Sequence, residues 1–107
     1  MMAMPGGFDV LREAAGSLAR AEERFGSPGW EGDARRAVEL AYGAVAAEVE
    51  SDDILVVLPA LPRYMWVDML RLSELKRMTP ELDGDKLLDA AREAVEIASA
   101  LLLQSLG

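Results

Sequence analysis

Three carboxylates near the C-terminal end have a spacing that suits metal chemistry. Asp89, Glu93 and Glu96 are four and three residues apart, so a helix would carry them on one face. Carboxylate oxygens are preferred ligands of Mg²⁺, and helical bundles can hold such ions between carboxylates on facing helices. The facing carboxylates would have to come from a second acidic cluster, in residues 48–53.

This pattern resembles one half of the site in all-α nucleotide pyrophosphohydrolases, which place an E-x-x-E pair opposite an E-x-x-D pair. Glu93 and Glu96 form the first pair, but residues 48–53 straddle a predicted helix end and form no clear second pair. An Mg²⁺-dependent enzyme of that kind is an alternative function, with Asp89, Glu93 and Glu96 as metal ligands. The simpler interpretation is a solvated face, because these carboxylates lie opposite much of the apolar stripe of the same helix.

Other chemistries lack their usual residues. The chain contains no histidine and no cysteine, which removes the commonest general base, the commonest transition-metal ligand and every thiolate nucleophile. Its serines therefore have no histidine base, and no G-K-[ST] phosphate loop is present. We predict no catalytic residue and no cofactor, and the sequence favours a protein that is not an enzyme without deciding the point.

The chain is acidic, with 19 Asp and Glu against 11 Lys and Arg and a formal charge of −8. That balance disfavours nucleic-acid binding, which depends on neutralising phosphates. The longest apolar runs, residues 54–60 and 100–103, are far shorter than a membrane span. Residues 1–7 lack the basic and apolar parts of a signal peptide. We predict a cytoplasmic protein with no nucleic-acid partner and no membrane partner.

Apolar residues recur at helical spacing through most of the 107 residues, and they amount to 51% of the chain with only 6% aromatic. The predicted fold class is all-α: a single antiparallel bundle of four main helices plus a short extra helical turn. One domain covers residues 8–107, after a disordered leader in residues 1–7. The four helices are predicted at residues 9–25, 33–50, 64–78 and 86–106, and Phe25 is placed on the inner face of the first.

Short signals between these helices predict the connections. Residues 26–29 (GSPG) separate the first helix from the second, which starts at Trp30 or Asp33. Ser51 with the acidic residues after it predicts an N-cap for a short buried helix that ends before Pro59. Residues 79–81 (TPE) are typical of a helix start. Because Gly84 follows, Asp83 or Asp85 is the alternative start of the last helix.

Small residues line the inner face of the second helix. Ala34, Ala37, Ala41 and Ala44 recur at spacings of three and four. Such a stripe allows a neighbouring helix to approach closely, so we predict that Ala41 and Ala44 are buried at a close helix–helix contact. Tyr42 interrupts the stripe, and its hydroxyl needs a polar partner if the ring is buried.

Residues 32–50 resemble the second helix of HEPN-type proteins, which carries a run such as A-x-x-x-A-Y-x-A after a short turn. The run is contained here in ARRAVELAYGA, residues 34–44. The resemblance implies a four- or five-helix bundle that is frequently dimeric, with functions from ribonuclease toxin to noncatalytic binding module. The ribonucleases carry an Arg-x4-6-His motif, and this chain has no histidine to match it. The middle region, residues 51–79, is also unusually short, so the resemblance implies a noncatalytic member.

A second resemblance is to small secreted helical-hairpin proteins, which have a W-x-G turn and a Y-x-x-x-D export tail. Residues 30–32 (WEG) and 64–68 (YMWVD) match these two short patterns. Pro59 and Pro62 interrupt the long second helix that the family needs. The secreted hairpin is therefore kept as an alternative to a local plug at Trp30 and a core pair of Tyr64 and Trp66.

The C-terminal helix predicts self-association. Leu101, Leu102 and Leu103 point about 100° apart, so one bundle cannot easily bury all three. Trp66 and Met69, with the neighbouring Tyr64 and Met65, would supply the facing surface, because aromatic residues and Met are enriched in interface cores. We predict a homodimer or a helical protein partner, and a noncatalytic interaction or assembly module. The alternative is that Leu103 is a single exposed leucine at the helix end.

Overall fold

The all-α class is confirmed. A computed structural model describes residues 6–106, with side chains up to residue 104, and no strand occurs in that part of the chain. The α-helices are α1 (Gly7–Glu23), α2 (Trp30–Val49), α3 (Trp66–Met78) and α4 (Gly84–Leu101). Short 3₁₀ segments connect them, at η1 (Ile54–Ala60), η2 (Arg63–Met65) and η3 (Thr79–Glu81), and a π-helical turn, η4 (Leu102–Leu106), follows α4.

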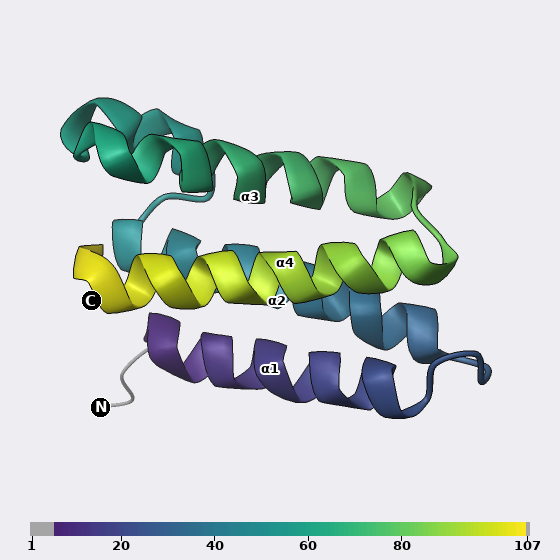
Figure 1. Ribbon diagram of the computed structural model, residues 1–107. Helices are drawn as coiled ribbons and strands as arrows, with labels where there is room; N and C mark the ends of the chain where they lie inside the picture. Colours follow the sequence, from purple (N-terminus) through teal and green to yellow (C-terminus); the bar gives the residue numbers. More distant parts are fainter. Residues whose placement is uncertain (1–5, 107) are drawn as a thin grey trace.

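Successive α-helices run in opposite directions, and the two outer helices, α1 and α3, lie on opposite sides of α2 and α4 (Figure 1). Helix α2 packs against both α1 and α4, and α3 packs against α4 and α2. Among the described residues, α1 and α3 make at most marginal contact. The molecule measures 42 × 35 × 20 Å, so its smallest dimension is about two helix diameters.

The alanine stripe of α2 is buried as predicted. Ala34, Ala37, Ala41 and Ala44 are all 0% exposed. Close approach is most evident at Gly7, where an added Cβ would lie 2.7 Å from the carbonyl oxygen of Ala44. Only glycine fits there, so the backbones of α1 and α2 nearly touch at this end.

Helix α1 begins earlier than predicted because a side chain of α2 satisfies its first amide. The Gly7 N–H donates to Glu48 Oε1 at 2.7 Å, which provides the acceptor that an N-terminal helix residue needs. Of the predicted leader, residues 1–5 lie outside the described residues, whereas Gly6 is the N-cap of α1 and Gly7 is its first residue. Phe25 was expected inside but lies beyond the end of α1. It is exposed and stacks on Trp30, with ring centroids 4.6 Å apart.

Tyr42 has the polar partners that its burial requires. Its hydroxyl donates to the Asp52 carbonyl oxygen at 2.9 Å and accepts from the buried Ile54 N–H at 3.1 Å. The Lys76 ammonium lies 4.1 Å from the centre of its ring, within cation–π range. Tyr42 therefore joins α2 to the start of η1 and to α3.

The segment before α3 differs from its prediction. The N-cap is Asp53 rather than Ser51, and its carboxylate accepts from the Leu55 N–H at 3.0 Å. Segment η1 continues through Pro59, because the fixed φ of proline suits a 3₁₀ helix. Only Ile54 of this segment is fully buried, while Leu55, Val57 and Leu58 are partly buried against the core. The expected short buried helix is instead a partly buried 3₁₀ connection.

The connection between α3 and α4 also differs from its prediction. Residues 79–81 do not start α4 but extend the end of α3, where the Thr79 hydroxyl donates to the Leu75 carbonyl oxygen at 2.5 Å. Helix α4 begins at Gly84 with Asp83 in the N-cap position, close to the alternative start. Met65, Met69, Leu72 and Leu75 are all buried and form the inner face of α3 and of the turn before it.

Candidate functional site on the α3–α4 face

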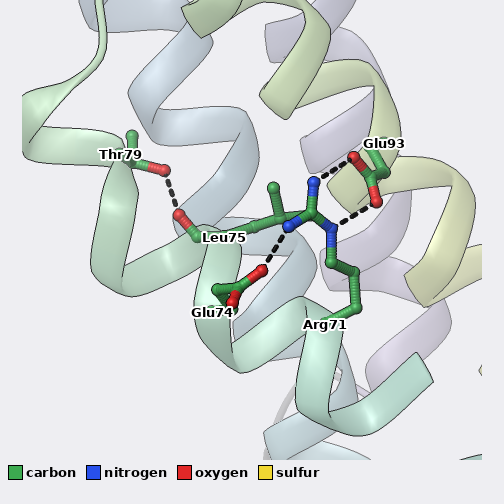
Figure 2. Close-up of polar contacts among 5 residues, drawn as sticks. All are labelled: Arg71, Glu74, Leu75, Thr79 and Glu93. Carbon is green, nitrogen blue, oxygen red and sulfur yellow. Dashed lines mark hydrogen bonds and ion pairs between the residues drawn. The ribbon is translucent and has the colours of Figure 1, made fainter. Parts of the chain in front are cut away.

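A cluster of charged side chains bridges α3 and α4. Arg71 lies in the middle of α3, and its guanidinium faces Glu93 of α4 (Figure 2). Arg71 Nε lies 2.6 Å from Glu93 Oε2 and Arg71 Nη2 lies 2.9 Å from Oε1, so the contact is bidentate. Arg71 Nη1 also pairs with Glu74, one turn further along α3. Two helices are thereby joined by one of the stronger kinds of surface ion pair.

The bridge changes the acidity of its members. Hydrogen bonding from Arg71 holds the pKa of Glu93 below its ordinary value, against a smaller opposing effect of burial. The same bonds, to Glu93 first and Glu74 second, raise the pKa of Arg71. Glu93 is therefore charged near neutral pH and is already paired with a cation.

Hollows lie on either side of this bridge, between the two helices. The first, of about 460 Å³, is lined by Val67 of α3 and by Ile97 and Ala100 of α4, with acidic residues at its rim. The second, of about 200 Å³, lies toward the α3–α4 connection and includes Leu82 and Ala90 in its lining. The first hollow continues toward the end of the molecule that carries η2 and η4.

Large apolar side chains are exposed beside the first hollow. Val67 is 73% exposed and Tyr64, one turn before it, is 66% exposed. Leu103 is 75% exposed and follows Ala100 by one turn. The start of α3 and the end of α4 lie at the same end of the molecule (Figure 1), and Tyr64 of η2 and Leu103 of η4 adjoin these two helix ends. We call Tyr64, Val67, Ile97, Ala100 and Leu103 the apolar patch.

The structure places the predicted interface residues in two different environments. Leu101, Leu102 and Met69 are in the core of the single chain, so they cannot form a contact surface in this conformation. The chain buries two of the three consecutive leucines, because the π-helical turn that begins at Leu102 changes the direction of the side chains that follow α4. Leu103 remains exposed, so it is the one of the three leucines that can still contact another molecule.

Trp66 lies at the edge of this region. It is partly buried, its indole N–H donates to the Leu61 carbonyl oxygen at 3.1 Å, and the Arg63 guanidinium lies 5.7 Å from its ring centre. The expected core pair of Tyr64 and Trp66 is wrong for Tyr64, which points to solvent. Tyr64 precedes α3 in a 3₁₀ turn, and this places it off the inner face that Met65 and Met69 share.

The proposed metal ligands are not assembled into a site. Within residues 6–104, no group of three carboxylates is placed to hold a metal ion. Glu93 is bound by Arg71, whose guanidinium occupies the position where a cation would lie. Asp89 is exposed and lies 3.7 Å from Arg92, and Glu96 is exposed. Asp89 and Glu96 thus face solvent, whereas Glu93 is partly buried in its pair with Arg71.

The two short patterns of the secreted-hairpin resemblance lie on different helices. Residues 30–32 open α2 instead of forming the turn before it, and residues 64–68 run from η2 into α3. Trp30 is buried, as expected for a plug at the end of the molecule. The described chain has four α-helices in place of the two that a hairpin would have.

Sequence reasoning missed the contribution of Val67, Ile97 and Ala100 to this face, and the Arg71–Glu93 pair. The sequence did contain part of the information needed to predict these contacts. Once the short connection makes α3 and α4 antiparallel neighbours, residues before Arg71 must lie beside residues after Glu93. What the sequence did not reveal is the angle at which α3 rests on α4, which decides whether Val67 is covered.

No helix in the described part of the chain is both long and apolar enough to cross a membrane. Comparison of the chain with protein-family models, with curated proteins and with solved structures finds no match in any of the three. The α3–α4 face itself is therefore the basis for any functional conclusion.

Proposed function

We propose that the protein is a noncatalytic helical module that self-associates through the apolar patch on α3 and α4. The observation that carries this proposal is the combination of an exposed Leu103 with the adjacent 460 Å³ hollow lined by Val67, Ile97 and Ala100. Contiguous apolar surface of this kind usually marks a contact site.

A second copy of the chain is the occupant that fits best. The patch contains a projecting side chain, Leu103, beside a hollow whose apolar lining residues are Val67, Ile97 and Ala100 and whose other lining residues are charged. Two copies related by a two-fold axis can each insert Leu103 against the apolar part of the other's hollow. Such an isologous contact needs one surface to complement itself. A different helical partner is the other outcome, since it would use the same surface.

The charged bridge limits the patch on one side. Arg71 and Glu93 neutralise each other, so they add polar contacts at the rim without leaving an unpaired charge in the contact. Asp68 and Glu96 also line the hollow. Their negative charge, together with the net charge of −8, opposes association of two copies at low ionic strength.

Sedimentation equilibrium of the full chain between about 10 and 500 μM tests the proposal. We expect a mass that rises from the monomer value of 11.6 kDa toward twice that value. Added NaCl should strengthen association, because salt screens the repulsion between two acidic copies. A contact dominated by ion pairs would respond in the opposite way.

Leu103→Glu is the decisive variant. It places a charge at the centre of the patch and should abolish the dimer at all these concentrations, while the far-UV circular dichroism and Tm of the monomer stay unchanged. Phe8→Glu is the matched control, since Phe8 is also an exposed apolar residue but lies on α1. A monomer in the wild type, or equal loss of the dimer in both variants, would contradict self-association through this patch.

Two broader expectations accompany this proposal. The resemblance of residues 34–44 to the HEPN-type second helix is consistent with a dimeric, noncatalytic helical protein. We also propose that the protein acts in the cytoplasm on protein partners. The net charge of −8 favours protein partners over nucleic acid.

A further inference from the structure

Arginine side chains gather around a hollow between α1 and α2, on helices remote from the apolar patch. Arg12, Gly16 and Arg20 are four residues apart and so lie on one stripe of α1. Arg36 of α2 reaches the same hollow, which has a volume of about 310 Å³ and is also lined by Glu13 and Ser17. Gly16 has no side chain, and this leaves open space between the arginines.

Arg20 is held in place over that space. Its Nη2 donates to the Oγ of the buried Ser17 at 3.0 Å, and its Nε lies 3.6 Å from Asp33 Oδ1. A Cβ added at Gly16 would lie 3.7 Å from Arg20 Nη1, so the guanidinium lies next to the open space. Two neighbours thus fix a group of donors beside the hollow before any ligand arrives.

The positive charge at this site is not balanced. Arg12 and Arg36 form no hydrogen bond or ion pair with any other residue that the structure describes. Arg12, Arg20 and Arg36 line the hollow together with one carboxylate, Glu13. Asp33 is not part of that lining and pairs with Arg20 and Arg24. Positive side chains therefore outnumber negative ones at the hollow, in a chain whose overall charge is −8.

We infer that this hollow binds the phosphoryl group of a small phosphorylated molecule. Guanidinium groups present planar, forked donors that match the oxygens of a phosphoryl group, and several of them can bind one such group together. A volume near 310 Å³ is at the lower end for ligand sites and suits a small molecule. A nucleic-acid strand would also meet the acidic remainder of the surface, which opposes its binding.

Titration of the ¹⁵N-labelled full chain with inorganic phosphate tests this inference, with NaCl at equal ionic strength as the reference. We expect saturable shift changes centred on the amides of Gly16, Ser17 and Arg36. Arg36→Gln should weaken phosphate binding by about tenfold, the effect of losing one charge-assisted hydrogen bond. Gly16→Leu should weaken it at least as much, because it fills the hollow and leaves every charge in place.

Arg77→Gln is the matched control, because it removes one exposed positive charge on α3, outside the hollow. It should leave phosphate binding unchanged, as should Leu103→Glu, which separates this inference from self-association. The inference is overturned if chloride and phosphate give the same shifts, or if Arg77→Gln weakens binding as much as Arg36→Gln. It is also overturned if Gly16→Leu, shown by circular dichroism to be folded, binds phosphate like the wild type.

Discussion

The two outer helices attach to the α2–α4 pair in opposite ways. The fully buried residues of α1 are all small, Gly7, Ala14, Ser17 and Ala21, while its larger apolar residues Val10, Leu11 and Leu18 are only partly buried. The alanine stripe of α2 is on the facing helix. Helix α3 buries Met69, Leu72 and Leu75, with Met65 just before it. One attachment depends on close approach of backbones, and the other on long side chains that fill the space between more widely separated helices.

This difference explains where surface is available for a partner. Small residues at the α1–α2 contact leave little freedom in the position of α1, as the lack of space at Gly7 shows. Hollows of about 460 and 200 Å³ lie between α3 and α4, whereas the hollow of about 310 Å³ between α1 and α2 is lined mostly by charged side chains. Methionine also adapts to changes in its surroundings. The α3 side is therefore the side on which we place the partner contact.

The largest expected effect on stability comes from disrupting the close packing of small residues on α2. Ala41→Leu adds volume where the alanine is fully buried, and such overpacking should lower the free energy of unfolding by ~3 kcal/mol. In a domain of this size that corresponds to a fall in Tm of roughly 10–20 °C. Thermal melting followed by circular dichroism measures it.

Met69→Leu on the other attachment is the matched comparison, since Met69 is equally buried but the substitution nearly conserves volume. It should cost less than about 1.5 kcal/mol. Equal melting temperatures for Ala41→Leu and the wild type would show that the small-residue contact does not constrain α2.

The sequence predicted the small-residue packing between α1 and α2 better than the packing of α3 on α4. Alanines at spacings of three and four leave few interpretations, and their burial is confirmed. By contrast, the run of consecutive leucines and the enrichment of Met in interface cores placed Leu101, Leu102 and Met69 at an interface, although the chain buries all three. Large apolar residues suit a core and a contact surface equally well, and only the packing of α3 on α4 decides between them.

The next largest effect on stability should come from the hydrogen bonds by which Tyr42 of α2 holds the start of η1. Tyr42→Phe removes the hydroxyl that pairs with the Asp52 carbonyl oxygen and the buried Ile54 N–H. An unpaired buried donor costs about 1–3 kcal/mol, and we expect a loss of ~1–2 kcal/mol because η1 can partly open to water. Urea denaturation measures the change.

Tyr64→Phe is the control for this variant, because Tyr64 loses the same atom from an exposed ring. It should leave the free energy of unfolding within error of the wild type. If Tyr42→Phe behaves like Tyr64→Phe, the hydroxyl does not hold η1 against α2.

The hydrogen bonds of Tyr42 and the Arg71–Glu93 pair show why the candidate site was harder to predict than the fold. Sequence reasoning required a polar partner for Tyr42 but did not name Asp52 or Ile54, since the path of the chain after Val49 was unknown. It likewise placed Glu93 on a solvated face, and its pairing with Arg71 depends on the register of two helices. Both contacts are tertiary, and local patterns do not encode them.

The smallest expected effect concerns the bridge between α3 and α4. Because Arg71 lowers the pKa of Glu93, the pair stabilises the folded chain above the ordinary pKa of glutamate, and this contribution is lost as the pH falls through the lowered value. Both side chains keep about 40% exposure, so solvent screening limits the effect to less than about 1 kcal/mol.

Urea denaturation of the wild type and Glu93→Gln at pH 7 and pH 3 measures this contribution. The two proteins should differ at pH 7 and converge at pH 3. Glu96→Gln removes a carboxylate that is not part of the bridge, and it should show no such convergence. A difference between wild type and Glu93→Gln that grows as the pH falls would reverse the sign expected for this pair.

The near absence of contact between α1 and α3 affects how the molecule unfolds. Substitutions in one outer helix should change stability nearly independently of substitutions in the other, because the two helices make almost no direct contact. Helix α3, with its exposed connections, can open as a cooperative unit while α1, α2 and α4 stay folded, since local openings in proteins follow such contiguous units. A partner that covers the apolar patch would therefore suppress this opening, and amide hydrogens in α3 would exchange more slowly while those in α1 would not change.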